Sequence, residues 1–104
     1  MTLSTHVLDA AAGRPAAGVP VTLERRCDDR RDGWTVLATA VTDDDGRVRD
    51  FGPVHPGVHR LTFDTEALST FYPEVAVAFV VADEGHHHVP LLLSPFAYST
   101  YRGS

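Results

Sequence analysis

The sequence predicts an all-β fold, an antiparallel sandwich of eight strands with one short helical connection. Apolar residues recur in short runs separated by glycine, proline and aspartate, which is the spacing of strands and not of ordinary helices. One run, residues 74–82, is apolar on both of its alternating faces, so we expect a helix or another subunit to cover the outer face. The length of 104 residues suits one compact domain, residues 1–104.

The expected strands alternate with residues that favour turns. The strands are 3–8, 19–25, 34–42, 48–51, 58–64, 74–82, 88–93 and 97–102. Turns, where glycine, proline and aspartate accept or pre-set the dihedral angles, are expected at 13–15, 32–33, 45–46, 55–57 and 94–95. The charged run 25–32 suits a solvated hairpin connection. Thr65 is expected to cap one helical turn over 65–70, which is too short to cover much of a sheet.

The composition argues against several classes of partner. The net charge of -5 comes from acidic residues scattered among arginines, without the basic stripe that binds phosphate backbones, so no nucleic acid is expected. Cys27 is the only cysteine, so an internal disulfide is impossible and a reducing compartment fits. No signal-peptide pattern occurs, and no apolar run approaches the roughly 20 residues of a membrane span. We therefore expect a cytoplasmic protein without membrane association.

The first expected strand carries His6 on its more polar face. Alternation places one set of side chains on one face and a second set on the other: Leu3, Thr5 and Val7, then Ser4, His6 and Leu8. An imidazole titrates near neutral pH and suits acid or base catalysis. A single histidine in a strand is nevertheless more often structural.

Three consecutive histidines, His86, His87 and His88, lead into the seventh expected strand. Residues two apart in a strand share a face and lie roughly 6.5 to 7 Å apart, so His86 and His88 point one way and His87 the other. Pro90 cannot donate to a ladder, which suits the rim of a sheet, where side chains reach solvent or a cleft. Three exposed histidines at a strand start would fit the same pattern.

Arg47 follows the tight turn at Asp45 and Gly46 and enters the next strand directly. Its planar, permanently charged guanidinium can be aimed at a polarised oxygen or an anionic ring. The plainer interpretation is a surface arginine beside a turn. A calcium loop is not indicated, because the acidic residues of 43–46 are consecutive and no glutamate follows at the required position.

The closing segment, Tyr101-Arg102-Gly103-Ser104, brings a phenol, a guanidinium, a hydroxyl and the α-carboxylate into four residues. Such a charged segment attached to an apolar strand indicates that the terminus is used. The carboxylate is ionised at neutral pH and can fix an imidazole tautomer or orient a water. Ser104 supplies a hydroxyl, but no aspartate is placed by sequence to complete a Ser-His-acid relay, so a nucleophilic serine is not indicated.

Taken together, these segments resemble the 5-hydroxyisourate hydrolase family, the transthyretin-related enzymes of urate breakdown. The matching segments run almost end to end: 3–9, 13–20, 45–47, 71–75, 86–95 and 101–104. The resemblance implies a transthyretin-like sandwich that assembles as a homotetramer, with its sites in a central channel between subunits. It also implies a longer helix in typical relatives where this chain has only 65–70.

The resemblance further implies hydrolysis of 5-hydroxyisourate to 2-oxo-4-hydroxy-4-carboxy-5-ureidoimidazoline, with no metal and no other cofactor. His6, Arg47, His88 and Ser104 match catalytic positions, and His6, Arg47 and Tyr101 would bind the substrate. One histidine would act as general base on water and the other would protonate the departing nitrogen, and the sequence leaves open which is which. His86 would lie at the edge of the site.

Two other classes of function fit parts of the same residue set. A transthyretin-like carrier would hold a small hydrophobic ligand in the channel, although this polar lining would leave groups without partners around it, which is costly. A zinc protein would use His6, His86 and His88, because three histidines can hold zinc and leave a catalytic position open. Spacing alone does not establish that the three converge.

Overall fold

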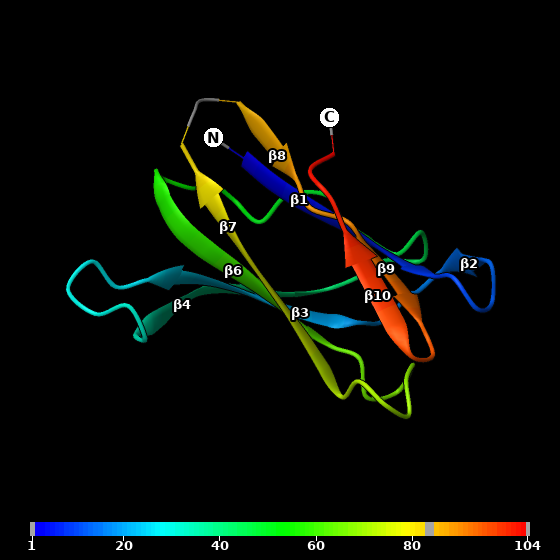
Figure 1. Cartoon of the computed structure of the whole chain (residues 1–104). Helices are drawn as coiled ribbons and strands as arrows, with labels where there is room; N and C mark the ends of the chain where they lie inside the picture. The colour runs from blue at the N-terminus through cyan, green and yellow to red at the C-terminus, as the bar shows by residue number, and fades with distance from the viewer. Residues whose placement is uncertain (1, 83–84, 104) are drawn as a thin grey trace.

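In the computed structural model, which describes residues 2–82 and 85–103, two β-sheets pack face to face (Figure 1). The strands are β1 (Thr2–Asp9), β2 (Arg14–Pro15), β3 (Pro20–Arg26), β4 (Trp34–Val41), β5 (Arg47–Val48), β6 (Gly57–Asp64), β7 (Glu74–Val81), β8 (His86–His88), β9 (Leu91–Ser94) and β10 (Ala97–Thr100). Over the described ranges no helix is present, and so none that is long and apolar enough to cross a membrane. The predicted all-β sandwich is confirmed.

The first sheet is organised around β1. Its order is β10-β9-β1-β2, and β5 and β8 also pair with β1. The strand runs antiparallel to β2 and β5 but parallel to β8 and β9, so this sheet is mixed where an antiparallel one was expected. The parallel pairs arise because the chain passes through the second sheet between β1 and β8 and returns in the original direction.

The second sheet is antiparallel throughout, in the order β4-β3-β6-β7. Its last strand, β7, buries Val75 and Val81 against the first sheet. Val80 on the outer face is 66% exposed, so both faces of this strand are apolar as predicted. The covering of the outer face stays a prediction.

The core lies between the sheets and draws on both. The first sheet and the segments around it contribute Leu3, Val7, Ala16, Val19, Val89, Leu91 and Leu93, and the second contributes Val21, Leu23, Leu61, Phe63, Val75 and Val81, all buried, with Val54 completing the cluster. Because β1 fills this core with one face, its other face is free to carry polar side chains.

Three local expectations differ from the structure. The expected strand 88–93 is two strands, β8 and β9, because Pro90 has no N–H for the ladder. Short pairings with β1 add β2 and reduce the expected strand 48–51 to β5, so ten strands replace eight. The expected helix at 65–70 is a single turn, in which the carbonyl of Thr65 accepts bonds from the N–H groups of Leu68 and Ser69. The Thr65 hydroxyl donates to the Tyr72 carbonyl and does not cap the turn.

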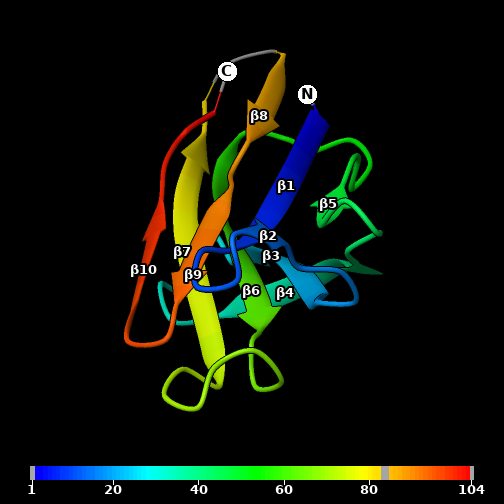
Figure 2. The same cartoon turned by 90° about the vertical axis from the view of Figure 1, so that its right-hand side faces the viewer.

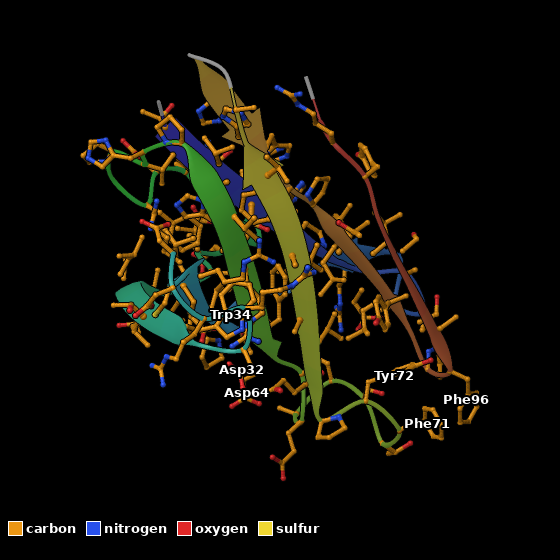
Figure 3. The ribbon with its side chains drawn as sticks, turned by 60° about the vertical axis from the view of Figure 1, so that its left-hand side comes forward. Asp32, Trp34, Asp64, Phe71, Tyr72 and Phe96 are labelled. Carbon is orange, nitrogen blue, oxygen red and sulfur yellow. The ribbon has the colours of Figure 1, made fainter. Side chains whose placement is uncertain are left out.

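Aromatic side chains hold this short connection against the β9–β10 turn. Phe71, Tyr72 and Phe96 gather at this end of the sandwich (Figure 3). The ring of Phe71 lies 4.9 Å from that of Tyr72 and 6.0 Å from that of Phe96, and the Tyr72 hydroxyl donates to the Phe96 carbonyl at 3.1 Å. The connection is therefore anchored without a helix.

The opposite end of the sandwich brings distant parts of the chain together. The starts of β1 and β8 and the segment after β10 lie at this end in both views (Figures 1 and 2). Residues more than 80 positions apart thereby become neighbours, as Ser4 and His88 do in the register of β1 and β8.

Candidate functional site

Polar side chains gather on the outer face of β1 and its two flanking strands. His6 is paired with Arg47 across β1 and β5, and Ser4 is paired with His88 across β1 and β8. Directly paired residues point to the same face of a sheet, with antiparallel Cβ atoms about 4.5 to 5.5 Å apart. The structure thus brings His6, Arg47 and His88 to one face of the first sheet, and all three are half-buried.

The tautomer of His6 follows from its hydrogen bond. Its Nε2 lies 2.9 Å from the carbonyl oxygen of Asp45. A carbonyl oxygen only accepts, so Nε2 carries a proton and donates it. In the neutral ring the lone pair is then on Nδ1, which is the nitrogen left to exchange a proton with a ligand.

The turn before β5 fixes Arg47 and the Asp45 carbonyl beside β1. The Asp43 carboxylate accepts bonds from the N–H groups of Asp45 and Arg47, at 2.9 and 3.0 Å, and the bond from Arg47 is the main cause that lowers the Asp43 pKa. Gly46 has a φ of 75°, and a Cβ there would lie 2.5 Å from the Val7 carbonyl oxygen. Only glycine therefore allows this turn to press against β1.

The Arg47 guanidinium has no hydrogen-bond or ion-pair partner among residues 2–82 and 85–103. Its main chain is held on both sides, by the Asp43 carboxylate and by the pairing with β1. A fixed backbone and an uncommitted cationic group are the arrangement expected of a side chain that binds an anionic or polarised oxygen.

His88 is held as a neutral base. Burial is the main cause that lowers its pKa, and electrostatic repulsion from Arg47, and from His6 and His86 when they are protonated, lowers it further, while a hydrogen bond with Ser4 opposes these effects. Its Nδ1 lies 2.7 Å from the Ser4 hydroxyl oxygen. With Nδ1 engaged, Nε2 is the nitrogen that remains for a ligand.

The chain after β10 passes directly over His88. The Gly103 N–H donates to the His88 carbonyl at 2.8 Å, and a Cβ on Gly103 would lie 2.5 Å from Cδ2 of the His88 ring. Glycine is required here by close approach to the ring, not by its dihedral angles. The closing segment is therefore packed onto the site, and Ser104, the fourth predicted catalytic residue, lies outside the described residues.

Tyr101 lines a cavity that His6, Arg47 and His88 do not line. This cavity, of about 230 Å³, is also lined by Phe79 of β7 and His87, the histidine that points away from His86 and His88. Two further cavities, of about 540 and 270 Å³, lie at the second sheet, beside Thr22 and Thr62 and beside Arg26 and Cys27. The binding role predicted for Tyr101 stays a prediction.

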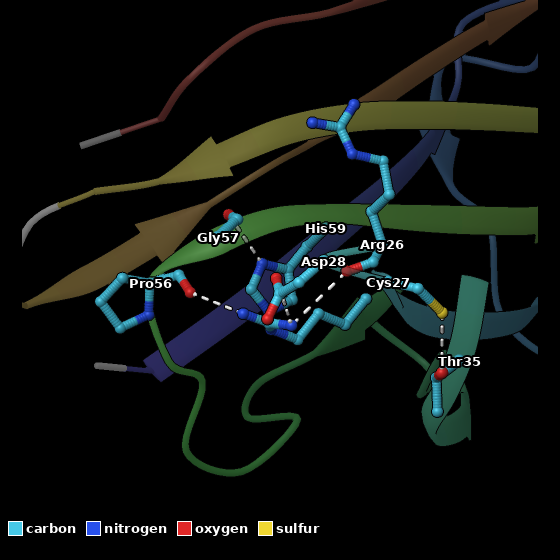
Figure 4. A network of polar contacts seen from close by, with 8 residues as sticks. Arg26, Cys27, Asp28, Thr35, Pro56, Gly57 and His59 are labelled. Carbon is cyan, nitrogen blue, oxygen red and sulfur yellow. Dashed lines mark hydrogen bonds and ion pairs between the residues drawn. The ribbon is translucent and has the colours of Figure 1, made fainter. Parts of the chain in front are cut away.

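A separate polar network links the β3–β4 hairpin to the start of β6 (Figure 4). Arg25 donates to the Asp28 carboxylate at 3.3 Å and to the Pro56 carbonyl at 3.2 Å, while the Cys27 thiol lies 3.5 Å from the Thr35 hydroxyl. These contacts tie loops together and reach none of the three site residues. Across the described ranges no three His, Cys, Asp or Glu side chains are arranged to hold a metal ion.

Sequence reasoning missed Ser4, which bonds to two histidines. Its hydroxyl lies 2.7 Å from Nδ1 of His88 and 2.7 Å from Nε2 of His86. The available signal was its position two residues before His6, on the same face of the strand. The parallel pairing with β8 that completes the contact has no local signal, because 84 residues separate the partners.

The chain resembles known proteins over nearly its whole length. The model of the HIUase/Transthyretin family matches residues 3–103. A protein of Salmonella dublin named 5-hydroxyisourate hydrolase is 46% identical over 98% of this chain and 80% of its own length. The mouse protein of the same name is 43% identical over 98% of this chain and 94% of its own length.

Two solved structures share the fold. The 5-hydroxyisourate hydrolase of Klebsiella pneumoniae has a TM-score of 0.85 and 38% identity, covering all of both chains. Sea bream transthyretin, solved in complex with thyroxine, has a TM-score of 0.88 and 35% identity, covering 97% of this chain and 93% of its own. The same fold therefore occurs in a relative named as an enzyme and in a relative solved with bound thyroxine.

Proposed function

This chain belongs to the HIUase/Transthyretin family, and we propose that it hydrolyses 5-hydroxyisourate to 2-oxo-4-hydroxy-4-carboxy-5-ureidoimidazoline. The observation that carries this proposal is the outer face of β1, where two imidazoles and an uncommitted guanidinium lie together. The relatives named as 5-hydroxyisourate hydrolases, at 43% to 46% identity, support it. The substrate is thus a small molecule.

His88 is the proposed general base. Its lowered pKa keeps the ring neutral at neutral pH, and Nε2 is the nitrogen not engaged by Ser4. It takes a proton from water as the water oxygen attacks the ring carbonyl carbon.

His6 is the proposed acid for the departing nitrogen. The bond from Nε2 to the Asp45 carbonyl leaves Nδ1 as the nitrogen through which a protonated ring can donate to the substrate. The carboxyl group formed in the product is ionised at neutral pH and returns a proton to this site. The two histidines therefore have different roles because different neighbours hold them.

Arg47 is proposed to stabilise the oxyanion and to bind the urate-like ring. Fixed donors aimed at a developing negative charge typically account for about 10²- to 10³-fold in rate. Ser104 and Tyr101 complete the proposed set, as a catalytic hydroxyl and a substrate-binding phenol. Ser104→Ala and Tyr101→Phe test them, and unchanged kcat/KM in either variant removes that residue from the mechanism.

A homotetramer with sites at subunit interfaces is proposed as the working assembly. Half-buried side chains on an open sheet face, and the exposed apolar face of β7, support completion of the site by a second copy. Sedimentation that finds only monomers at assay concentration, together with full activity, would exclude shared sites. The free Cys27 supports the accompanying proposal of a cytoplasmic location.

A carrier function is the second candidate, because the sea bream relative was solved with thyroxine. The polar face of β1 is unsuited to a hydrophobic ligand, since its groups would lose water without gaining partners. Saturable thyroxine binding without hydrolysis would favour the carrier.

The test of the proposed function is the ultraviolet decay of freshly generated 5-hydroxyisourate, with and without the untagged protein and again after chelation of metals. We expect acceleration that survives chelation. An oligomeric, folded protein that gives no acceleration would refute the hydrolase, and activity restored only by zinc would replace the metal-free mechanism.

A further inference from the structure

Four side chains form a continuous hydrogen-bonded row that ends at His88. The Ser4 hydroxyl oxygen lies 2.7 Å from Nδ1 of His88 and 2.7 Å from Nε2 of His86. Nδ1 of His86 in turn lies 2.6 Å from the Thr2 hydroxyl oxygen. Ser4 is 7% exposed, whereas His86 is exposed, so the row leads from the site to solvent.

The row has two polarities in which the serine proton is used within it, because a serine hydroxyl has one proton. Ser4 then donates to one of the two imidazoles and accepts from the other, whereas accepting from both would leave its own proton without a partner in the row. If it donates to His88, that ring carries its proton on Nε2. If it donates to His86, His88 keeps its proton on Nδ1 and has its lone pair on Nε2.

The reaction selects between these polarities. Ser4 occupies Nδ1 of His88, so only Nε2 can meet the attacking water, and a general base needs its lone pair there. His88 must then donate from Nδ1 to Ser4, and Ser4 to Nε2 of His86, whose own Nδ1 proton goes to Thr2.

We infer that Ser4 and His86 are positioning residues that hold His88 in its Nδ1–H tautomer, with Nε2 free to act as base. The inference rests on the proposed function for its kinetic consequence, but not for the tautomer itself. Ser4 has the place that an acid or carbonyl has in other histidine sites, where a partner on one nitrogen sets the state of the other. His86 acts through Ser4 and does not touch the substrate.

The tautomer can be read directly from the ¹⁵N chemical shifts of the histidine rings in the intact protein. We expect His88 to carry its proton on Nδ1 in the wild type. In Ser4→Ala and His86→Ala the Nε2–H form should become populated, whereas Ser4→Thr, which keeps a hydroxyl, should retain the wild-type state. His55→Ala, which removes an exposed histidine outside the row, is the matched control.

Kinetics give the second readout. We expect kcat to fall about tenfold or more in Ser4→Ala and His86→Ala, with little change in KM, and to recover in Ser4→Thr. A wild-type His88 protonated on Nε2, or an unchanged tautomer and kcat in both alanine variants, would overturn the inference. A lower kcat with an unchanged tautomer would assign Ser4 and His86 a merely structural role and overturn it as well.

The two proposals fail separately. A wild-type protein that does not hydrolyse 5-hydroxyisourate refutes the proposed function and leaves the ¹⁵N result to decide the tautomer. An active wild type whose His88 tautomer ignores both substitutions refutes the positioning role alone.

Discussion

Each sheet of the sandwich carries a polar group built around one arginine, and the two groups differ in how their charges are satisfied. On the second sheet Arg60 donates two bonds to Glu24, at 3.1 and 2.7 Å, and Thr62 donates to the same carboxylate at 2.8 Å. The guanidinium also lies 4.1 Å from the ring centre of Trp34, which Figure 3 labels on this sheet. The bond from Arg60 lowers the pKa of Glu24, although burial opposes it.

The group on the first sheet is left open. Arg47 is held by its main chain, but in the described part of the chain its guanidinium has no bonded partner. His6 and His88 each commit one ring nitrogen to a neighbour and keep the other. A charged side chain that is paired with neighbouring residues stabilises the fold, whereas an unpaired charged side chain is available to bind a ligand. This contrast predicts that substitutions in the two groups will have opposite consequences.

The largest effect is expected for Arg47→Gln. The loss of a fixed cationic donor should lower kcat/KM by about 10²-fold or more, because no other group replaces it at the oxyanion. Stability should change by less than about 0.5 kcal/mol, since no bond within the described fold is broken. Steady-state kinetics and thermal unfolding of the same preparation check both parts. A marked loss of stability would mean that Arg47 is structural after all.

A smaller loss of activity is expected for His88→Ala, more than about tenfold in kcat with the fold intact. The lowered pKa of His88 also predicts that the wild-type rate persists as the pH falls below the ordinary histidine value of about 6.5, because the base stays neutral there. The pH profile of kcat/KM measures this. An unchanged rate in His88→Ala would remove it from the mechanism.

Arg60→Gln, in contrast to Arg47→Gln, should lower stability and leave activity unchanged. It leaves the half-buried Glu24 with one partner in place of three bonds, so we expect a loss of about 1 to 2 kcal/mol of unfolding free energy. Activity at a temperature where the variant is folded should match the wild type. Chemical denaturation measures the first quantity, and a large fall in kcat/KM would contradict the assignment of this group to stability.

The smallest effect concerns His59, a fully buried histidine of β6 in the second sheet. Burial is the main cause that lowers its pKa. Below about pH 6.5 this ring is therefore protonated in the unfolded chain but stays neutral in the folded chain. The unfolding free energy should therefore fall as the pH drops from 7.5 to 5.5, by at most about 1.4 kcal/mol per pH unit for one group. His59→Gln should flatten this slope in part, because His88 contributes in the same direction. An identical slope would exclude His59 as a source.

The sequence predicts the fold and the polar face of β1 well because both depend on local alternation. Leu3, Thr5 and Val7 are buried and His6 is on the opposite face, as the pattern requires. The parallel pairing of β1 with β8 and β9 was not predictable in this way, because it depends on the path of the chain between two sheets. That pairing is what places Ser4 against His86 and His88.

The most direct test of ligand binding at the outer face of β1 is the histidine ring and tryptophan indole spectrum of the protein titrated with urate, a stable analogue of the substrate ring. We expect the signals of His6 and His88 to shift with saturable binding while the indole N–H of Trp34, on the other outer face, stays unchanged. Shifts at Trp34 without shifts at the two histidines would place ligand binding on the wrong sheet and contradict it.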